Sequence, residues 1–332
     1  MNTKPISLDD IYSLAFKCLT INGTDNENAS VLSKTILNAE RDGSISHGLF
    51  RLPGYVASLR SGKVNGKARP KAKNITSSVI SIDGDNGFAP MAHSVGLPIL
   101  VDSAKISGVS VLSITQTHHF AALWPEVEAI AEENLVGLAC TSYLPSVAPS
   151  GAKKPLFGTN PIAFSWPRPG NTPVVFDMAT ASMAMGEVQV AARDGHRIPL
   201  GTGLNKEGNQ TEEPNDIIDG GVLLPFGGYK GSAIALMVEL LAGGLINQNF
   251  SFESKEKDNN DGGPPTGGQF IIALSPAIIS DNNWENHCNE FFKRFSELGD
   301  ARLPGARRHK NRLDLSPREI DEGLLKKIND LM

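Results

Sequence analysis

Short apolar runs that alternate with helical stretches occupy the middle of this chain and constrain its fold more than any other feature. The runs are rich in valine, isoleucine and phenylalanine, which favour strands. The expected strands are 78–82, 109–114, 136–140, 162–166, 173–176 and 270–274, with helices over 91–106, 121–134 and 230–246. The centre is therefore predicted to be mixed α and β, while the polar, glycine- and proline-rich stretch 254–268 predicts a surface loop.

The two ends of the chain carry helix signals and little strand pattern. Serine, threonine and aspartate side chains cap the first turn of helices, and glycine commonly follows the last turn. The expected helices are one capped by Ser7 with Asp10 and ended near Gly23, one started by Thr24 with Glu27 and ended at Gly43, one over 47–61 bent or delayed by Pro53, and one opened by the capping box from Ser316 to Glu319 with Pro317 as its first residue. Helical ends thus flank the mixed centre.

Bulk properties limit the class of protein. A chain of 332 residues corresponds to roughly two domains. The net charge of −5 without a basic block argues against nucleic acid as a partner. The three cysteines, Cys18, Cys140 and Cys288, form no C-x-x-C pair and fit a reducing cytoplasm. We find no signal segment and no membrane-spanning run, so we expect a cytoplasmic protein acting on a small molecule.

The segment from Ser46 to Arg51 combines a hydroxyl, an imidazole and a guanidinium. One turn of helix would place His47 and Arg51 on the same face. An imidazole can transfer a proton near neutral pH, and a guanidinium binds a carboxylate through two parallel hydrogen bonds. The segment therefore indicates a site for a small carboxylic acid whose reaction moves one proton, although the spacing alone favours the alternative of a surface histidine and a surface arginine without partners.

The glycines at 227–231 do not have the G-x-G-x-x-G spacing of a Rossmann dinucleotide site. They precede an apolar helix and include Lys230, so they are compatible with a phosphate-binding helix start. The alternative is an ordinary tight turn before a buried helix. No Walker motif is present.

Taken together, these segments resemble the malate/L-lactate dehydrogenase-like family of non-Rossmann oxidoreductases. The residues that carry the resemblance are Arg41 to Arg51, His119 to Leu123, Gly158 to Pro161, Phe176 to Ala179, Pro225 to Gly231 and Arg302 to Arg308. Within the family the chain is most similar to the reductases of delta-1-piperideine-2-carboxylate and delta-1-pyrroline-2-carboxylate, on the phrases 119–125 and 249–253.

The resemblance implies an α+β fold with a large, mostly antiparallel sheet that binds a nicotinamide cofactor. It also implies a helical domain built from both chain ends, so that residues 1–73 and 285–332 form the helical domain and 74–284 form the cofactor domain with an inserted subdomain. It further implies a homodimer.

The resemblance assigns His47 as proton donor, with Ser46 as its relay partner. Arg51 would bind the substrate carboxylate, and Thr159 would help to hold the substrate. The family has an aspartate as second relay residue where this chain has Glu187, which keeps the charge but adds a methylene group. The alternatives are a helix cap for Ser46, a turn residue for Thr159 and a helix-surface carboxylate for Glu187.

The cofactor positions implied by the resemblance are His119, Phe120, Ala121, Ala122, Leu123, Asp177, Met178, Ala179, Tyr229, Lys230, Arg302, Leu303, Pro304, Gly305, Ala306, Arg307 and Arg308. Adjacent arginines suit the additional phosphate of NADPH, so we expect NADPH, with NADH less favoured. The alternative is a solvated basic loop. His118 beside His119 suggests a metal, but we find no carboxylate at ligand spacing and expect none to be bound.

The expected reaction is therefore NADPH-dependent reduction of a cyclic imine carboxylate to L-proline or L-pipecolate. A 2-hydroxy acid dehydrogenase acting on malate, lactate or ureidoglycolate would use the same histidine and arginine. A non-catalytic ligand-binding protein on the same scaffold is a further alternative, favoured only by Glu187. The sequence leaves the choice between five- and six-membered rings open, since one methylene group changes binding by only about 1–3 kcal/mol.

Overall fold

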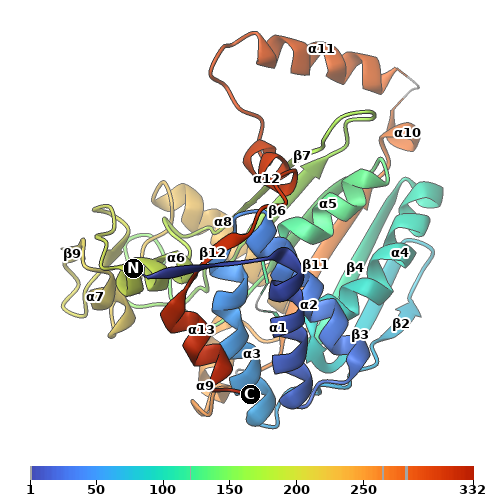
Figure 1. Cartoon of the computed structure of the whole chain (residues 1–332). Coiled ribbons are helices and arrows are strands. Elements are labelled where there is room, and N and C mark those ends of the chain that lie inside the picture. Colours follow the sequence, from blue (N-terminus) through green and yellow to red (C-terminus); the bar gives the residue numbers. More distant parts are fainter. Residues whose placement is uncertain (1, 120, 264, 281–282) are drawn as a thin grey trace.

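The computed structural model describes residues 2–119, 121–263, 265–280 and 283–332, and a seven-stranded sheet forms its centre (Figure 1). Five of its six strand pairs are antiparallel and only β3–β4 is parallel. The strands, in spatial order, are β2 (Lys71–Asn74), β3 (Val79–Phe88), β4 (Val109–His118), β11 (Gly267–Leu274), β5 (Val136–Thr141), β6 (Ile162–Trp166) and β7 (Val174–Met178). The predicted mostly antiparallel sheet is confirmed.

Helices cover both faces of this sheet. On one face α4 (Ala89–Ser107) packs on β3 and β4, and α5 (Trp124–Glu132) packs on β5 and β6. Their apolar side chains share one core with the strands, and Gly96 brings α4 close because a Cβ there would lie 2.9 Å from Leu112. On the other face α8 (Tyr229–Glu239) and the π-helical turn η3 (Leu240–Leu245) pack on β5 and β11.

Both chain ends contribute to a second, helical core. Its apolar residues come from α1 (Leu8–Ile21), α2 (Asn26–Arg41), α3 (Leu52–Arg60) and α13 (Glu322–Asn329). The strands β1 (Thr3–Ile6) and β12 (Arg318–Asp321) pair antiparallel and join the two ends (Figure 1). The helical nature of the ends is confirmed, but the division into domains at 73 and 285 stays a prediction.

A smaller unit surrounds a three-stranded sheet. Its elements are α6 (Met185–Asp194), β8 (Gly203–Leu204), β9 (Gln210–Thr211), α7 (Pro214–Ile218) and β10 (Val222–Leu223). The remaining elements are the 3₁₀ turns η1 (Ile45–His47) and η2 (Leu49–Arg51), and the helices α9 (Ser251–Lys257), α10 (Pro276–Ile279), α11 (Trp284–Ser296) and α12 (Ala306–Arg312). In the part of the chain that the structure describes, no helix combines the length and apolarity that a bilayer crossing demands.

Local predictions are mostly confirmed at the level of elements, with three corrections. Ser7 caps α1 as expected, but Asp25 rather than Thr24 caps α2. The segment 254–268 is partly helical, because α9 extends to Lys257. The prediction of a helix that begins at Ser316 is wrong, because Arg318 to Asp321 form an edge strand and Asp321 caps the last helix.

Candidate active site

We call Ser46 to Arg51 the catalytic segment. One cavity of about 670 Å³ lies between this segment, the loop before α5, the end of β7 and the start of α6. Its walls combine short polar side chains with alanine and methionine, and Arg307 and Arg308 supply positive charge. The lining residues are 43–47, 121–124, Thr159, Pro161, 177–179, 181–184, Glu187, Val190, Phe226, Arg307 and Arg308. The cavity is therefore formed by segments from the whole length of the chain.

Two successive 3₁₀ turns, not a regular helix, hold the catalytic segment. Ser46 and His47 lie in η1 and Arg51 ends η2. The buried carboxylate of Glu40 on α2 accepts a hydrogen bond from the Leu49 amide at 2.7 Å, and a side chain on Gly48 would collide with that carboxylate. Burial raises the pKa of Glu40 to about 7. Glu40 thus fixes the turn between His47 and Arg51.

Ser46 and His47 are brought together, and both line the cavity. The Oγ of Ser46 lies 3.0 Å from Nδ1 of His47, which leaves Nε2 of that ring for other contacts. Burial, together with the nearby charges of Arg51 and His119, lowers the pKa of His47 to about 3. The imidazole is therefore neutral at pH 7 in the substrate-free protein.

The guanidinium of Arg51 forms no ion pair with any described residue, and its buried Nε has no hydrogen-bond partner. Arg51 is not among the residues that line the cavity, but its terminal nitrogen lies beside Gly186 at the start of α6, close to Ser46, which does line it. A Cβ on Gly186 would lie 2.5 Å from a terminal nitrogen of Arg51. A buried guanidinium that has no anionic partner among the described residues suits a negatively charged ligand.

Replacing Gly186 with alanine tests this placement. The added methyl group would displace the guanidinium, and overpacking of this kind costs about 1–3 kcal/mol. We expect KM for an acid substrate to rise about tenfold or more, while the melting temperature falls little, because the helix propensity of alanine, better than that of glycine by about 1 kcal/mol, offsets part of the overpacking cost. Gly54→Ala in α3, where a Cβ meets nothing within 4 Å, is the matched control. Equal effects of both substitutions would contradict the placement.

The two remaining expected site residues, Thr159 and Glu187, both line the cavity but differ in their contacts. Thr159 lines the cavity, next to Asn160, whose amide donates to Glu239 at 2.9 Å and fixes the loop against α8. Glu187 also lines the cavity but forms no hydrogen bond with Ser46 or His47. Instead it accepts from the Ala184 amide at 3.3 Å and caps α6. Its proposed relay role is therefore not visible as a contact.

The expected cofactor residues separate into two groups. Those that line the cavity are Ala121, Ala122, Leu123, Asp177, Met178, Ala179, Arg307 and Arg308. Those that do not line it are His119, Tyr229, Lys230 and 302–306, of which Arg302, Leu303, Pro304 and Ala306 line a separate cavity of about 620 Å³. Tyr229 is 71% exposed. Phe120 lies outside the described residues.

Asp177 shapes the loop before α5. One of its carboxylate oxygens accepts from the amides of Leu123 and Trp124 at 2.7 and 3.0 Å. Burial raises the pKa of Asp177 to about 6. Arg308 stacks on the Trp124 ring at 5.3 Å and donates to the Val175 carbonyl at 2.8 Å. The first turn of α5 is thereby held against the arginine segment.

Sequence reasoning missed Trp124 and the anchor of α12. Arg312 of this helix donates to Asp42, which follows α2, and to Glu128 of α5, both at 2.7 Å, and Arg307 and Arg308 in the first turn of α12 line the cavity. The buried Nε atoms of Arg308 and Trp124 have no partner. Exposed Arg307 and these donors fit an anionic cofactor. Trp124 lies in the phrase 119–125 that carries the family resemblance, but the sequence alone assigns it no role.

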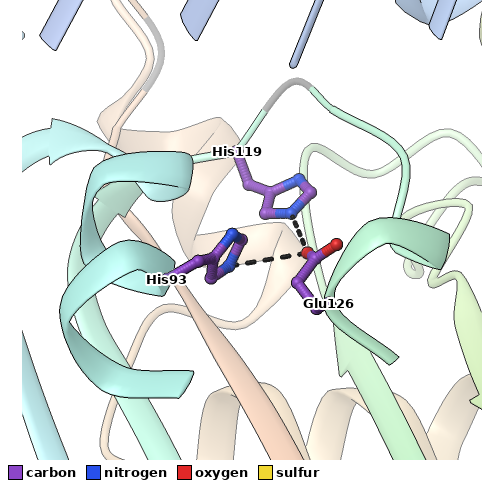
Figure 2. Close-up of side chains that lie close together, drawn as sticks. All are labelled: His93, His119 and Glu126. Atoms are coloured by element: carbon purple, nitrogen blue, oxygen red, sulfur yellow. Dashed lines mark hydrogen bonds and ion pairs between the residues drawn. The ribbon is translucent and has the colours of Figure 1, made fainter. Parts of the chain in front are cut away.

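A second polar cluster lies under the loop at 121–122. We call His93, His119, Glu126 and Gln269 the buried cluster, of which Figure 2 shows the first three. One oxygen of Glu126 lies 3.2 Å from Nε2 of His119 and 3.5 Å from Nε2 of His93. The reason given against a metal, the lack of a carboxylate at ligand spacing, is therefore wrong. The expectation that no metal ion is bound stays a prediction.

Comparison with known proteins gives a consistent result. The model of the malate/L-lactate dehydrogenase family matches residues 6–329. The Delta(1)-pyrroline-2-carboxylate/Delta(1)-piperideine-2-carboxylate reductase of Pseudomonas syringae pv. tomato is 44% identical over 310 residues, 93% of this chain and 90% of that protein. A Delta(1)-pyrroline-2-carboxylate reductase of Ancylobacter novellus is 41% identical over 92% of this chain and 91% of its own length. The crystal structure of delta1-piperideine-2-carboxylate reductase from Pseudomonas syringae superimposes with a TM-score of 0.93, 42% identity and coverage of 99% and 100%.

Proposed function

The chain belongs to the malate/L-lactate dehydrogenase family, and from this premise we propose that it reduces cyclic imine carboxylates with NADPH. The substrates would be delta-1-pyrroline-2-carboxylate, delta-1-piperideine-2-carboxylate or both, as for the relatives at 40–44% identity. Like the other members of its family, it is an oxidoreductase that depends on a nicotinamide cofactor. This argues against the non-catalytic alternative.

The proposal rests on one observation, that the guanidinium of Arg51 has no anionic partner among the described residues. Its charge is close enough to lower the pKa of His47, so a carboxylate bound by the guanidinium would lie beside the imidazole. A planar imine carboxylate presents both groups that this pair recognises, an anion for Arg51 and a ring nitrogen for His47. Thr159, which lines the same cavity, would limit the position of the ring.

The reaction requires a hydride and a proton. Bound NADPH supplies the hydride to the imine carbon, and the residues of the chain position the substrate and manage the proton. Binding of the carboxylate cancels the charge of Arg51, one of the causes that lower the pKa of His47, and thereby favours protonation of the imidazole. Protonated His47 would then donate from Nε2 to the ring nitrogen, while Ser46 holds Nδ1.

Arg307 and Arg308 support NADPH over NADH. Both line the cavity, and two guanidinium groups can bind the additional phosphate through paired hydrogen bonds. Asp177 would act indirectly, by fixing the backbone of Leu123 and Trp124.

The function is tested with purified protein, each of the two imines and each nicotinamide, by following the loss of reduced cofactor at 340 nm. We expect turnover with an imine and NADPH, and a kcat/KM with NADH lower by about tenfold or more, the value of one lost phosphate contact of about 1.5–3 kcal/mol. Inertness of both imines with both cofactors would refute the proposal, and equal rates with the two cofactors would refute the preference.

A second candidate is a 2-hydroxy acid dehydrogenase. A (2R)-3-sulfolactate dehydrogenase of Chromohalobacter salexigens is 38% identical over 326 residues. A ketone also needs a hydride and a proton, so the same His47 and Arg51 would serve. Pyruvate and sulfopyruvate assayed beside the imines would identify this activity.

We further propose a homodimer in the cytoplasm. Support for the dimer comes from apolar side chains on the surface, among which Ile279, Phe291 and Leu298 are each more than 60% exposed. Light scattering of the full chain would measure the mass of the assembly.

A further inference from the structure

The spacing of the buried cluster is close to that of the ligands of a metal ion. One oxygen of Glu126 lies 3.2 Å from Nε2 of His119 and 3.5 Å from Nε2 of His93, and the ligand atoms of the three residues lie within 4.8 Å of one another. Around a tetrahedral zinc ion, bonds of about 2.0–2.1 Å place neighbouring ligand atoms about 3.3–3.4 Å apart. Two of the three separations therefore suit zinc, and both rings point Nε2 at the same oxygen (Figure 2).

The carboxylate of Glu126 is a buried charge without a permanent cation beside it. Only 2% of its surface is exposed, and no lysine or arginine among the described residues pairs with it. Burial raises its pKa, but the neighbouring histidines and the amide of Gln269 outweigh burial and hold the pKa below its ordinary value, so the group is ionised. Burial lowers the pKa of His93, whose ring is therefore neutral at pH 7. Buried charges are normally paired or bound to a metal.

The polar contacts of the cluster crowd one atom. Nitrogens of His93, His119 and Gln269 all lie within 3.5 Å of the same Glu126 oxygen, which has only two lone pairs to accept with. A metal ion between the rings and the carboxylate would replace the two histidine contacts. The remaining hydrogen bond from Gln269, at 2.9 Å, would then orient the ligating carboxylate, as outer partners of metal ligands do. The alternative is a metal-free cluster, in which His93 donates to the amide oxygen of Gln269 instead.

A separate cavity would give an ion access to the cluster. This cavity has a volume of about 340 Å³, and its lining includes His93 and Glu126 together with Ala121 and Ala122 of the loop before α5. Zinc sites with three protein ligands keep a fourth position for water. Water from this cavity would occupy that position.

We propose that His93, His119 and Glu126 bind one zinc ion, and that this ion fixes the loop between His119 and Glu126. Residues 121–123 of that loop line the active-site cavity, so the ion would connect their position to α4, which carries His93. The proposal reverses the sequence-based prediction that no metal is bound. Its effect on NADPH rests on the proposed function, whereas zinc binding itself does not.

The first test is the metal content of the native protein. The full chain is produced without a histidine tag in medium that contains zinc, and its metals are measured by plasma mass spectrometry. We expect about one zinc ion per chain, and cobalt in its place should give the strong visible absorption of a four-coordinate site. Native protein that holds no zinc as isolated and takes up none when zinc is added would overturn the proposal, even if no variant folds.

Variants of the cluster locate the ion. His93→Leu and Glu126→Gln each remove one ligand and should lower the zinc content to a small fraction of the native value. Gln269→Leu removes only the outer hydrogen bond and should weaken zinc binding about 10–100-fold. His196→Asn, which removes an exposed histidine outside the cluster, is the control and should keep the full content. Full zinc content in both ligand variants would place the ion elsewhere and overturn the proposal.

Removal of the ion tests its effect on the loop. A chelator should release the zinc, lower the melting temperature and raise the Kd of NADPH about tenfold, and added zinc should reverse both changes. The fluorescence of the bound cofactor measures the Kd. An unchanged Kd would overturn the role assigned to the loop. Native protein that binds zinc but reduces neither imine would refute only the proposed function, and active protein without zinc would refute only this inference.

Discussion

Replacing Arg51 with alanine is expected to lower kcat/KM for a cyclic imine carboxylate by two to three orders of magnitude. Removing one partner of a buried charge pair costs about 2–5 kcal/mol, partly because the other charge then lies unpaired in a dry site. The guanidinium would bind the carboxylate before and during the reaction, so most of the effect should appear in KM. Steady-state kinetics with varied substrate at saturating NADPH measure it.

Two controls separate carboxylate binding from general damage. Arg193→Ala removes a guanidinium that shares the Phe50 ring with Arg51 but is paired with Asp194, so it should have little effect. A cyclic imine without the carboxylate should be reduced equally slowly by native protein and by Arg51→Ala. If the variant lost as much activity toward that imine as toward the acid, Arg51 would not be the carboxylate site. Arg51→Lys should recover little, because an ammonium group lacks the planar fork.

The strands of the main sheet could be predicted because apolar and β-branched side chains mark them locally. The centre strand β11 and its neighbour β5 are mostly buried and contain apolar runs, while β4 on the other side alternates buried and more exposed positions. The strands β1, β2 and β12 are short, polar and at edges, so their pairing depends on partners far away in sequence. The pairing of Thr3 with Asp321 joins the two ends of the chain, and no local pattern carries that information.

The candidate site shows the same limit. His47 with Arg51 was recognised in one segment, because the residue types themselves indicate proton transfer and carboxylate binding. The expected single helical turn is replaced by two 3₁₀ turns, because Glu40 from α2 binds the Leu49 amide between them. Contacts such as Gly186 against Arg51 and Glu126 against His119 arise only when distant elements pack, so the sequence alone does not predict them.

Replacing His47 with alanine is expected to lower kcat by about 10²–10⁴-fold, the range of general acid catalysis, with NADPH affinity unchanged. With a pKa of about 3 in the substrate-free protein, only about one His47 in 10⁴ is protonated at pH 7. If His47 is the acid, it becomes protonated in the substrate complex, where the carboxylate offsets the charge of Arg51, one of the causes that lower its pKa. Fluorescence titration of the cofactor and steady-state turnover separate the two effects.

The pH dependence decides whether His47 supplies the proton. If it does, kcat of the native protein should fall as pH rises through the pKa of His47 in the substrate complex, which must lie well above 3, and His47→Ala should lack this limb. Ser46→Ala removes only the hydrogen bond to Nδ1 and should keep the limb while lowering kcat by about tenfold. A flat native profile between pH 5 and 9 would mean that the substrate enters already protonated. His47 would then position the ring nitrogen, and its removal would raise KM more than it lowers kcat.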